Sequence, residues 1–335
     1  MKTEILTLNR SRNVTLTAYI QAVGGEFRYV SRRPAVLILP GGGYQMCSDR
    51  EADPVACAYL EAGYQVFILR YSVGDGSVWP NPLDDYELAM GTIRSKADEW
   101  NLYPDKIAVI GFSAGGHLAA CAAALSKNRP NAAILGYAVT AGETVRECCP
   151  TAPDVIGAVD KKTCPCFLFA TRDDNVVDIA NSIQMMDALA KAGISFESHI
   201  YAYGPHGFST GDTSIQDAAS GLCPRAKNWV PDSIGWLRDM FGDFGSNGMT
   251  EPACKPHVNG NAEEYLSVDC TIGHLLNNPE ARNILEPILS RSGQSMDHIG
   301  GIILRMKLRD AMRFGQASEE DIQSVNTRLS GIRNG

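Results

Sequence analysis

Apolar and polar positions alternate with two different periods along the first 240 residues. Short apolar runs predict strands. In the first run apolar residues alternate with polar ones, which predicts a half-exposed strand, and the other runs are continuous, which predicts buried strands. These runs cover residues 14–20, 35–39, 64–71, 106–110, 132–137, 166–170 and 196–201. Helical spacing between them predicts helices near residues 52–62, 84–100, 115–126, 179–192 and 226–241. Such alternation is typical of an α/β fold, with a mainly parallel sheet and helices on both faces.

The chain changes character after residue 243. Residues 244–262 are polar and rich in Gly and Pro, which predicts a linker after a domain over residues 1–243. The remaining residues, 263–335, predict a helical subdomain of three helices. An apolar stripe at helical spacing supports it, formed by Ala281, Ile284, Leu285, Ile288 and Leu289. Ser318, followed by three acidic residues, predicts the N-cap of the last helix.

Composition narrows the class of protein. The 335 residues are 44% hydrophobic and 20% charged, which is ordinary for a globular protein. The net charge of −8 and the lack of a basic stripe make nucleic acid an unexpected partner. No apolar run has the length of a signal peptide or a membrane span, so we expect a cytoplasmic protein that does not bind membranes. The ten cysteines lack zinc-ligand spacing, and we expect reduced thiols.

One motif carries a candidate nucleophile. The segment Gly111-Phe112-Ser113-Ala114-Gly115 matches G-x-S-x-G, the strand–turn–helix pattern that exposes a strained serine. The motif alone is weak, but a predicted buried strand precedes it and a helix-forming run follows it. We therefore expect Ser113 to be a nucleophile. The alternative is a Gly/Ser-rich turn without chemistry.

A second glycine cluster follows an earlier buried strand. The segment 40–44 reads Pro-Gly-Gly-Gly-Tyr, and its glycines allow backbone amides to point inward. In folds with this strand–turn–helix motif, two sets of backbone amides bind the oxyanion of a tetrahedral intermediate. One set comes from an early loop, and the other is the amide after the nucleophile, here that of Ala114. A phosphate-binding loop is disfavoured because no Gly-Lys-Ser/Thr follows.

A serine nucleophile needs a base and a carboxylate that orients it. His206 lies in a loop after the last predicted strand, where this base belongs. His117 follows the elbow glycines on the helix, and we expect it to point away from Ser113. Asp173 and Asp174 both follow the strand 166–170, and the pattern leaves the choice between them open.

Together these segments resemble the α/β-hydrolase fold and, within it, bacterial acetyl xylan esterase or feruloyl esterase-like carbohydrate esterases. The resemblance covers about residues 30–240, and its motifs are residues 40–44, 70–72, 104–107, 111–119 and 204–208. It implies that Gly42 and Gly43 serve the oxyanion hole. The acid loop of the family reads Asp-x-x-Val-Pro, which favours Asp174, although Asp178 replaces the proline.

The resemblance implies a serine esterase that removes acetyl or other small acyl groups from plant-derived oligosaccharides, without a metal or organic cofactor. Tyr44 and Trp79 are candidates for stacking on a sugar ring, with ordinary packing as the alternative. Other serine hydrolases of this fold, such as a general carboxylesterase or a peptidase, stay open, as does a non-catalytic binding protein. The tail is similar to a helical appendage of some gut-bacterial hydrolases, and we expect it to pack on the catalytic domain or to form a homo-oligomer.

Overall fold

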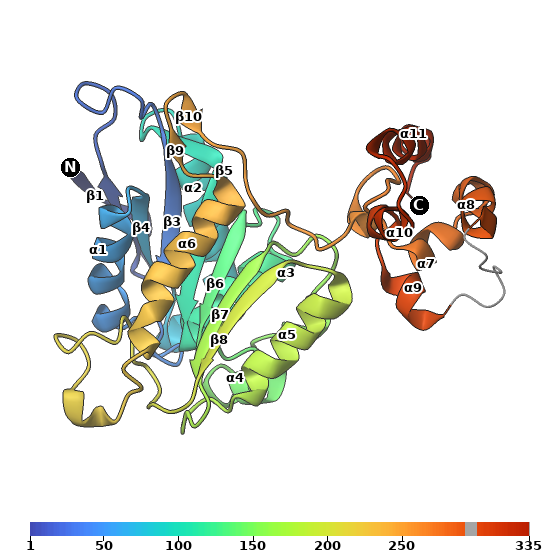
Figure 1. Cartoon of the computed structure of the whole chain (residues 1–335). Coiled ribbons are helices and arrows are strands. Elements are labelled where there is room, and N and C mark those ends of the chain that lie inside the picture. The colour runs from blue at the N-terminus through green and yellow to red at the C-terminus, as the bar shows by residue number, and fades with distance from the viewer. Residues whose placement is uncertain (292–299, 335) are drawn as a thin grey trace. The chain divides into compact units, whose positions relative to one another are not determined.

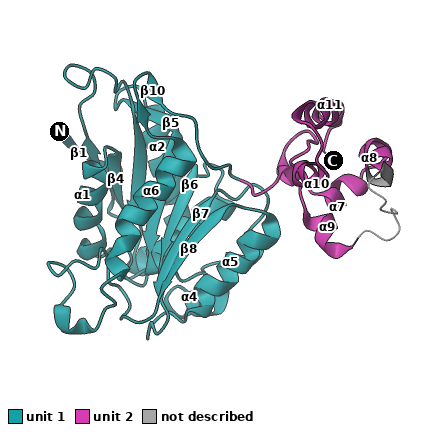
Figure 2. Ribbon diagram, in the orientation of Figure 1, with its two compact units in different colours: residues 1–256 teal, residues 257–335 magenta. Residues whose placement is uncertain are grey.

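The computed structural model describes residues 1–291 and 300–334, with the side chains of residues 289–291 left out. The chain forms two compact units, Met1–Pro256 and His257–Gly335 (Figure 2). Unit 1 contains the α/β fold, and unit 2 is helical.

Unit 1 is built on one eight-stranded sheet. Its strands are β1 (Lys2–Asn9), β2 (Val14–Ile20), β3 (Arg33–Leu39), β4 (Gln65–Arg70), β5 (Leu102–Phe112), β6 (Ala132–Gly136), β7 (Cys166–Thr171) and β8 (Phe196–Tyr201). They lie in the order β1-β2-β4-β3-β5-β6-β7-β8. The pairs β1–β2 and β2–β4 are antiparallel, and all the others are parallel. The predicted mainly parallel sheet is confirmed.

Helices cover both faces of this sheet (Figure 1). On one face, α1 (Asp53–Glu61) and α6 (Trp229–Phe241) bury their apolar sides, and on the other α2 (Asn81–Ser95), α3 (Ser113–Leu125) and α5 (Ala180–Ala192) do so. Successive strand side chains point to opposite faces. Leu37 and Leu39 therefore join the core under α3, while Val36 and Ile38 join the core under α1.

The strand order reverses direction at β3, which sets the place of the site. After β3 the chain pairs β4 on one side and then crosses to place β5 on the other. At such a switch point the loops that leave the carboxyl ends of neighbouring strands diverge and open a crevice. The loops after β3 and β5 carry the two glycine clusters, so the fold brings them together at this edge.

Several elements differ from the sequence predictions. β1 is absent from the prediction, because all its residues are exposed or only half-buried and its apolar pattern is weak. The seven-residue helix α4 (Gly142–Cys148) is too short to give a periodic signal. The seven predicted strands all exist, with ends that move by a few residues.

The expected linker over residues 244–262 is wrong for its first part. That stretch forms a small hairpin, β9 (Phe244–Gly245) with β10 (Gly248–Met249). Thr250 N–H donates to the carbonyl of Asp243 at 2.8 Å, and Ser195 N–H donates to the carbonyl of Pro256 at 2.9 Å. Residues 244–256 are thus bonded into unit 1, although they are polar.

Unit 2 contains five helices among its described residues, where three were predicted. They are α7 (Ile272–Leu276), α8 (Pro279–Arg291), α9 (Gly301–Arg305), α10 (Leu308–Phe314) and α11 (Glu319–Leu329). Helices of five to seven residues show too little periodicity to be predicted from sequence. The predicted cap is confirmed, since Ser318 and Asp321 form a capping box. Leu289 of the predicted stripe lies outside the described side chains.

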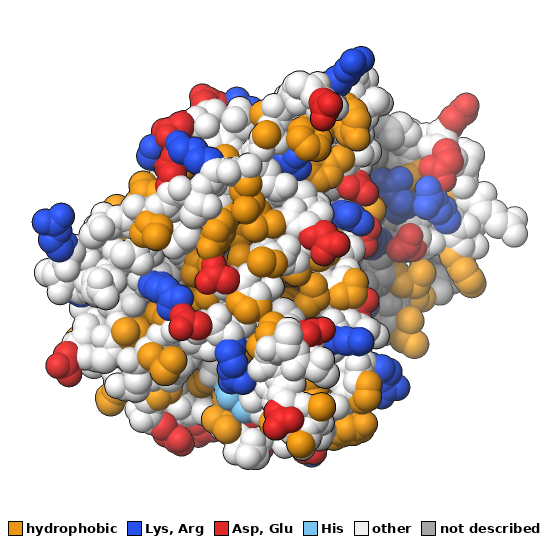
Figure 3. Space-filling model, turned by 90° about the vertical axis from the view of Figure 1, so that its left-hand side faces the viewer, with side chains coloured by type: hydrophobic (Ala, Val, Ile, Leu, Met, Phe, Trp, Pro, Cys, Tyr) orange, Lys and Arg blue, Asp and Glu red, His pale blue; other side chains and the backbone are white. Residues whose placement is uncertain are grey.

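The surface carries mixed charge. On the face drawn in Figure 3, Lys and Arg side chains lie among acidic ones and are not gathered into one patch. Among residues 1–291 and 300–334, no helix has both the length and the apolar character that crossing a bilayer requires.

The turn between β5 and α3 depends on glycines that lie against neighbouring backbone. A Cβ on Gly115 would stand 2.2 Å from the carbonyl oxygen of Leu39 and 2.4 Å from that of Pro40. A Cβ on Gly111 would stand 2.1 Å from the carbonyl oxygen of Gly115. Real atoms cannot approach this closely, so any side chain here would push α3 away from β3.

This contact predicts the effect of one methyl group. Gly115→Ala should lower the free energy of unfolding by about 2 kcal/mol or more, as overpacking does. The matched control is Gly91→Ala within α2, where a Cβ meets nothing within 4 Å and should stabilise by about 0.5–1 kcal/mol. Denaturant unfolding followed by tryptophan fluorescence measures both, because all four tryptophans lie in unit 1. Equal stability of the two variants would contradict the prediction.

Candidate active site

Ser113 stands at the turn from β5 into α3. Its φ of 53° lies in the left-handed region, which is strained for a residue with a side chain. The strain is held by the glycine contacts to β3 and by Val139 N–H, which donates to the carbonyl of Ser113 at 3.2 Å. This conformation raises Oγ above the end of the sheet and places it at the N-terminus of α3, where the helix dipole favours negative charge.

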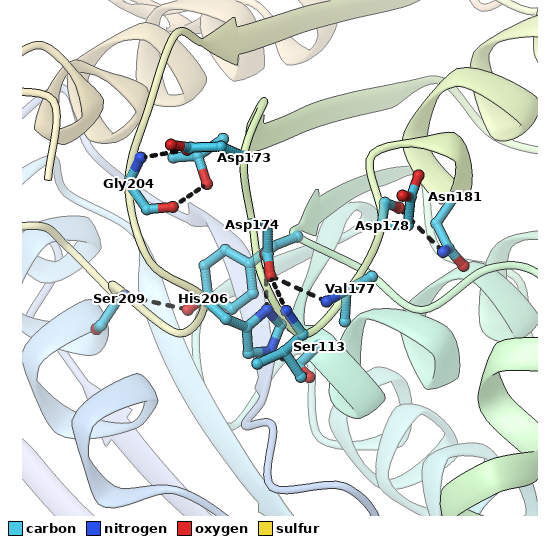
Figure 4. A network of polar contacts seen from close by, with 12 residues as sticks. Ser113, Asp173, Asp174, Val177, Asp178, Asn181, Gly204, His206 and Ser209 are labelled. Atoms are coloured by element: carbon cyan, nitrogen blue, oxygen red, sulfur yellow. Dashed lines mark hydrogen bonds and ion pairs between the residues drawn. The ribbon is translucent and has the colours of Figure 1, made fainter.

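A histidine and an aspartate line up behind Ser113 (Figure 4). Nε2 of His206 lies 2.9 Å from Oγ of Ser113, and Nδ1 of His206 lies 2.7 Å from Oδ2 of Asp174. Because the carboxylate can only accept, Nδ1 carries the proton and Nε2 accepts from the serine hydroxyl. The three side chains therefore have the geometry in which histidine can take a proton from serine.

The loop after β7 separates two neighbouring carboxylates. Oδ1 of Asp174 accepts from the amides of Val176 and Val177, each at 2.9 Å, which turns Oδ2 toward His206. Only 1% of the Asp174 side chain is exposed. Asp173 turns the other way, and its Oδ1 accepts from Gly204 N–H at 2.7 Å (Figure 4). The structure thus pairs Asp174 with His206, the arrangement that the resemblance favours.

Asp178, which replaces the proline of the family motif, has a local role. Its Oδ1 accepts from Ala180 N–H at 2.7 Å, at the start of α5. The nearby Asn181 side chain accepts from the amides of Thr140 and Ala141, each at 2.9 Å. These bonds hold the start of α5, where the loop that carries Asp174 ends.

The glycine loop after β3 presents free amides. Gly41 N–H is turned away, donating to Oε2 of Glu51 at 2.7 Å. Within the described part of the chain, the amides of Gly42 and Gly43 donate to no protein acceptor. The amide of Ala114 lies in the first turn of α3, where amides have no partner inside the helix. The three predicted oxyanion donors are therefore available to an external acceptor.

The structure contradicts Tyr44 as a candidate for stacking on a sugar ring and shows the alternative, ordinary packing. Its side chain is 0% exposed, and its hydroxyl donates to Nδ1 of His117 at 2.8 Å. Nε2 of His117 lies 3.0 Å from the carbonyl of Pro153, which can only accept, so Nε2 carries the proton of a neutral imidazole. The pair anchors the glycine loop to α3. Both ring nitrogens of His117 are thus bonded to Tyr44 and Pro153, whereas the histidine bonded to Ser113 is His206.

Trp79 lies close to this pair and is half-buried. Its ring stands 5.6 Å from the ring of His117, and its amide donates to Oγ1 of Thr151 at 2.9 Å. Part of the side chain stays accessible, so its role as a sugar platform stays a prediction.

Sequence reasoning missed two neighbours of the site. Cys148, at the end of α4, is half-buried. A Cβ added to Gly43 would lie 3.9 Å from the Cβ of Cys148. Glu51 bonds the glycine loop and is buried. Neither carries a motif: Glu51 lies in a run of charged residues, and Cys148 lies in a short helix with no periodic pattern.

Comparisons with known proteins find relatives among α/β hydrolases and esterases. A family model described as BD-FAE matches residues 28–146. The solved structure of MGS-M1, an α/β-hydrolase enzyme from a Medee basin deep-sea metagenome library, is 41% identical, and the match covers 72% of this chain and 98% of that one with a TM-score of 0.66. An acetyl ester-xyloside bifunctional hydrolase from Caldicellulosiruptor lactoaceticus is 26% identical, covering 71% of this chain and 96% of that one with a TM-score of 0.62.

An acetylxylan esterase from Xylanibacter ruminicola is 30% identical over 218 residues, which are 56% of this chain and 45% of that protein. The chain spans less than half the length of such curated relatives. A serine, a histidine and an aspartate at the carboxyl ends of a mainly parallel sheet define an α/β hydrolase. The chain belongs to the α/β-hydrolase family, and the resemblance to its carbohydrate esterases is confirmed.

Because Asp173 and Asp174 make different contacts, their substitution by Asn should affect the reactivity of Ser113 to different degrees. Asp174→Asn should slow the labelling of Ser113 by a fluorophosphonate on the order of 10⁴-fold, because an amide there favours the wrong imidazole tautomer. Asp173→Asn should change the rate by no more than about threefold, because the side-chain carbonyl of Asn can still accept from Gly204 N–H. Mass spectrometry of the labelled protein measures both rates. The reverse ranking would reject Asp174 as the acid.

The burial of His117 predicts a pH dependence of stability. Desolvation lowers the pKa of His117 from 6.5 to about 4. The unfolded chain therefore binds this proton first, and stability is lost as the pH falls from 6.5 toward 4, by about 3 kcal/mol from this group. Denaturant unfolding at each pH measures the loss. His117→Gln should be less stable at pH 7 but lose less on acidification, whereas equal slopes in the two proteins would contradict the prediction.

Proposed function

We propose that the protein is a serine carboxylic-ester hydrolase that removes acetyl or other small acyl groups from plant-derived oligosaccharides. The observation that carries the proposal is the unbroken row of hydrogen bonds from Ser113 through His206 to Asp174. Free amides on two sides of Ser113 complete what ester hydrolysis needs: a nucleophile, a base and donors for the developing oxyanion.

In the proposed reaction, Oγ of Ser113 attacks the ester carbonyl while Nε2 of His206 takes its proton. Asp174 stabilises the resulting imidazolium, and its second oxygen is already held by two backbone amides. The tetrahedral oxyanion is bound by the amides of Ala114 and of Gly42 or Gly43.

His206 then returns the proton to the leaving sugar hydroxyl, and the acyl group stays on Ser113. Water, deprotonated by His206, attacks this acyl-enzyme and releases the acid, which restores the serine hydroxyl. Every proton transfer uses the same nitrogen of one imidazole.

The substrate class draws support from the relatives and from the surroundings of the site. Two of the relatives are named for acetyl esters of xylan or xylosides. Cys148 borders the glycine loop, because its Cβ lies 3.9 Å from the position that a Cβ on Gly43 would take. Trp79 offers an aromatic surface for a sugar ring in the same neighbourhood.

The proposal predicts acetate release from acetylated xylo-oligosaccharides and manno-oligosaccharides. The native chain should release acetate, and Ser113→Ala should release at least about 10⁴-fold less. The matched control is Ser95→Ala, an exposed serine at the end of α2 that should keep full activity. Enzymatic determination of free acetate measures all three.

Two outcomes would contradict the proposal. Equal release by the native chain and Ser113→Ala would reject Ser113 as the nucleophile. Hydrolysis of a simple activated ester without any release from the acetylated oligosaccharides would keep the esterase and reject the sugar substrate. Longer acyl esters and peptides would then separate a general carboxylesterase from a peptidase.

A further inference from the structure

A buried carboxylate lies between the two loops that supply the oxyanion donors and the base. Glu51 ends the 3₁₀ turn Asp49–Glu51 and is only 3% exposed. Its Oε2 accepts from Gly41 N–H at 2.7 Å, and its Oε1 accepts from the hydroxyl of Tyr137 at 2.6 Å. Both oxygens accept, which is the bonding pattern of an ionised carboxylate. The proposed reaction gives this group no part, although burying it is costly.

The bond to Gly41 sets the direction of the oxyanion loop. A Cβ on Gly41 would stand 3.1 Å from Cβ of Ser113 and 2.8 Å from Oε2 of Glu51. The Gly41 peptide is therefore wedged between the nucleophile and the carboxylate. Because Glu51 takes the amide of Gly41, the next two amides, of Gly42 and Gly43, are left to face an external oxyanion.

The bond to Tyr137 reaches the other loop. The hydroxyl of Tyr137, which donates to Glu51, accepts from Ser209 N–H at 3.1 Å, three residues after His206. The ring of Tyr137 stands edge-on to the ring of His206 with centroids 5.0 Å apart. The hydroxyl of Ser209 also donates to the carbonyl of Arg50, in the same 3₁₀ turn as Glu51. One short turn thus holds the histidine loop at two points.

Several charged or titratable groups face this carboxylate. The pKa of Glu51 is raised from its ordinary value, chiefly by burial, while hydrogen bonds from Tyr137 and Gly41 and the nearness of His206 and Arg50 act in the opposite direction. Burial raises the pKa of Tyr71 well above 10 and that of Cys47 to about 11, so both are neutral near pH 7.

The contacts described above bring the charges of Asp174, Glu51 and Arg50 near His206. A Cβ on Gly207, the residue after His206, would lie 3.4 Å from Nη2 of Arg50. Removal of the Glu51 charge would leave the imidazolium facing one carboxylate and one guanidinium instead of two carboxylates and one guanidinium.

We propose that Glu51 is a positioning residue that ties the oxyanion loop to the histidine loop through Gly41 and Tyr137. The inference rests on the proposed function of Ser113 and His206 and adds a residue that touches neither substrate nor reacting atoms. It keeps the distance between the oxyanion donors and the base fixed while charge moves from Ser113 to the substrate. Misplacement of such groups by a fraction of an ångström is costly to catalysis.

The test compares Glu51→Gln, Tyr137→Phe and the double variant. Glu51→Gln keeps the shape but can no longer accept at both positions, and kcat for an activated acetyl ester should fall about 10- to 100-fold with little change in KM. The acidic limb of the pH profile of kcat/KM should move to lower pH, because the imidazolium loses a nearby negative charge.

Tyr137→Phe should lower kcat while the acidic limb stays in place, because the charge of Glu51 remains. The losses of the two single variants should not add in the double variant, because they break one chain of bonds. The matched control is Tyr59→Phe, which removes a buried hydroxyl bonded to Ser233 at 2.7 Å and should leave kcat and its pH profile unchanged.

Two results would overturn the proposal. One is Glu51→Gln with kcat within about twofold of native. The other is a loss of kcat that follows the loss of thermal stability in all variants, including the control, with the acidic limb unmoved. Either would give Glu51 a structural role only. If Glu51→Gln does not fold, the additivity test is lost, but Tyr137→Phe against Tyr59→Phe decides alone, and equal kcat in the two rejects the proposal.

The labelling rates distinguish failure of the proposed function from failure of the role proposed for Glu51. If the native chain cleaves no ester but Ser113 reacts with a fluorophosphonate, the assignment as an esterase fails while the labelling rates still test the role of Glu51. Slower labelling of Glu51→Gln and Tyr137→Phe than of Tyr59→Phe would support positioning, and equal rates in all three would reject it.

Discussion

The contact between the backbone of Gly115 and the carbonyls at the end of β3 is the constraint on which the site depends. It allows the chain to pass from β5 into α3 through a left-handed serine, since no side chain separates the helix from the sheet. The same contact brings the loop after β3 against the nucleophile. Ser113 and the proposed oxyanion donors therefore owe their distance to close backbone packing.

The other half of the site depends on hydrogen bonds between loops. Thr171 and Asp173, at the end of β7, hold both the carbonyl and the amide of Gly204, which begins the histidine loop. Asp174, the next residue, is then free to orient the imidazole. Two adjacent carboxylates in one sequence thus have separate tasks, one fixing the loop and one fixing the ring. The rings of Trp229 and Phe169 stack beneath this loop, with centroids 4.1 Å apart, and support it.

Much of this arrangement could be predicted from the sequence, and the exceptions share a cause. Buried strands are continuous apolar runs, and Ser113 and His206 lie in local motifs, so both kinds of feature are visible in short windows of sequence. The choice of Asp174 needed the family pattern as well. The burial of Tyr44 could not be predicted from its local sequence, because it depends on His117, which lies 73 residues further along the chain. Glu51 pairs with Tyr137 across 86 residues, and no local pattern marks such a pair.

The proposed function depends on the formation of an acyl-enzyme at Ser113. The most direct measurement mixes the native chain with an activated acetyl ester, quenches it in acid during turnover and sequences its peptides by mass spectrometry. We expect one acetyl group, carried on Ser113. Steady turnover with an acetyl group on another residue, or with no acetylated peptide at any quench time under conditions where deacylation limits the rate, would contradict it.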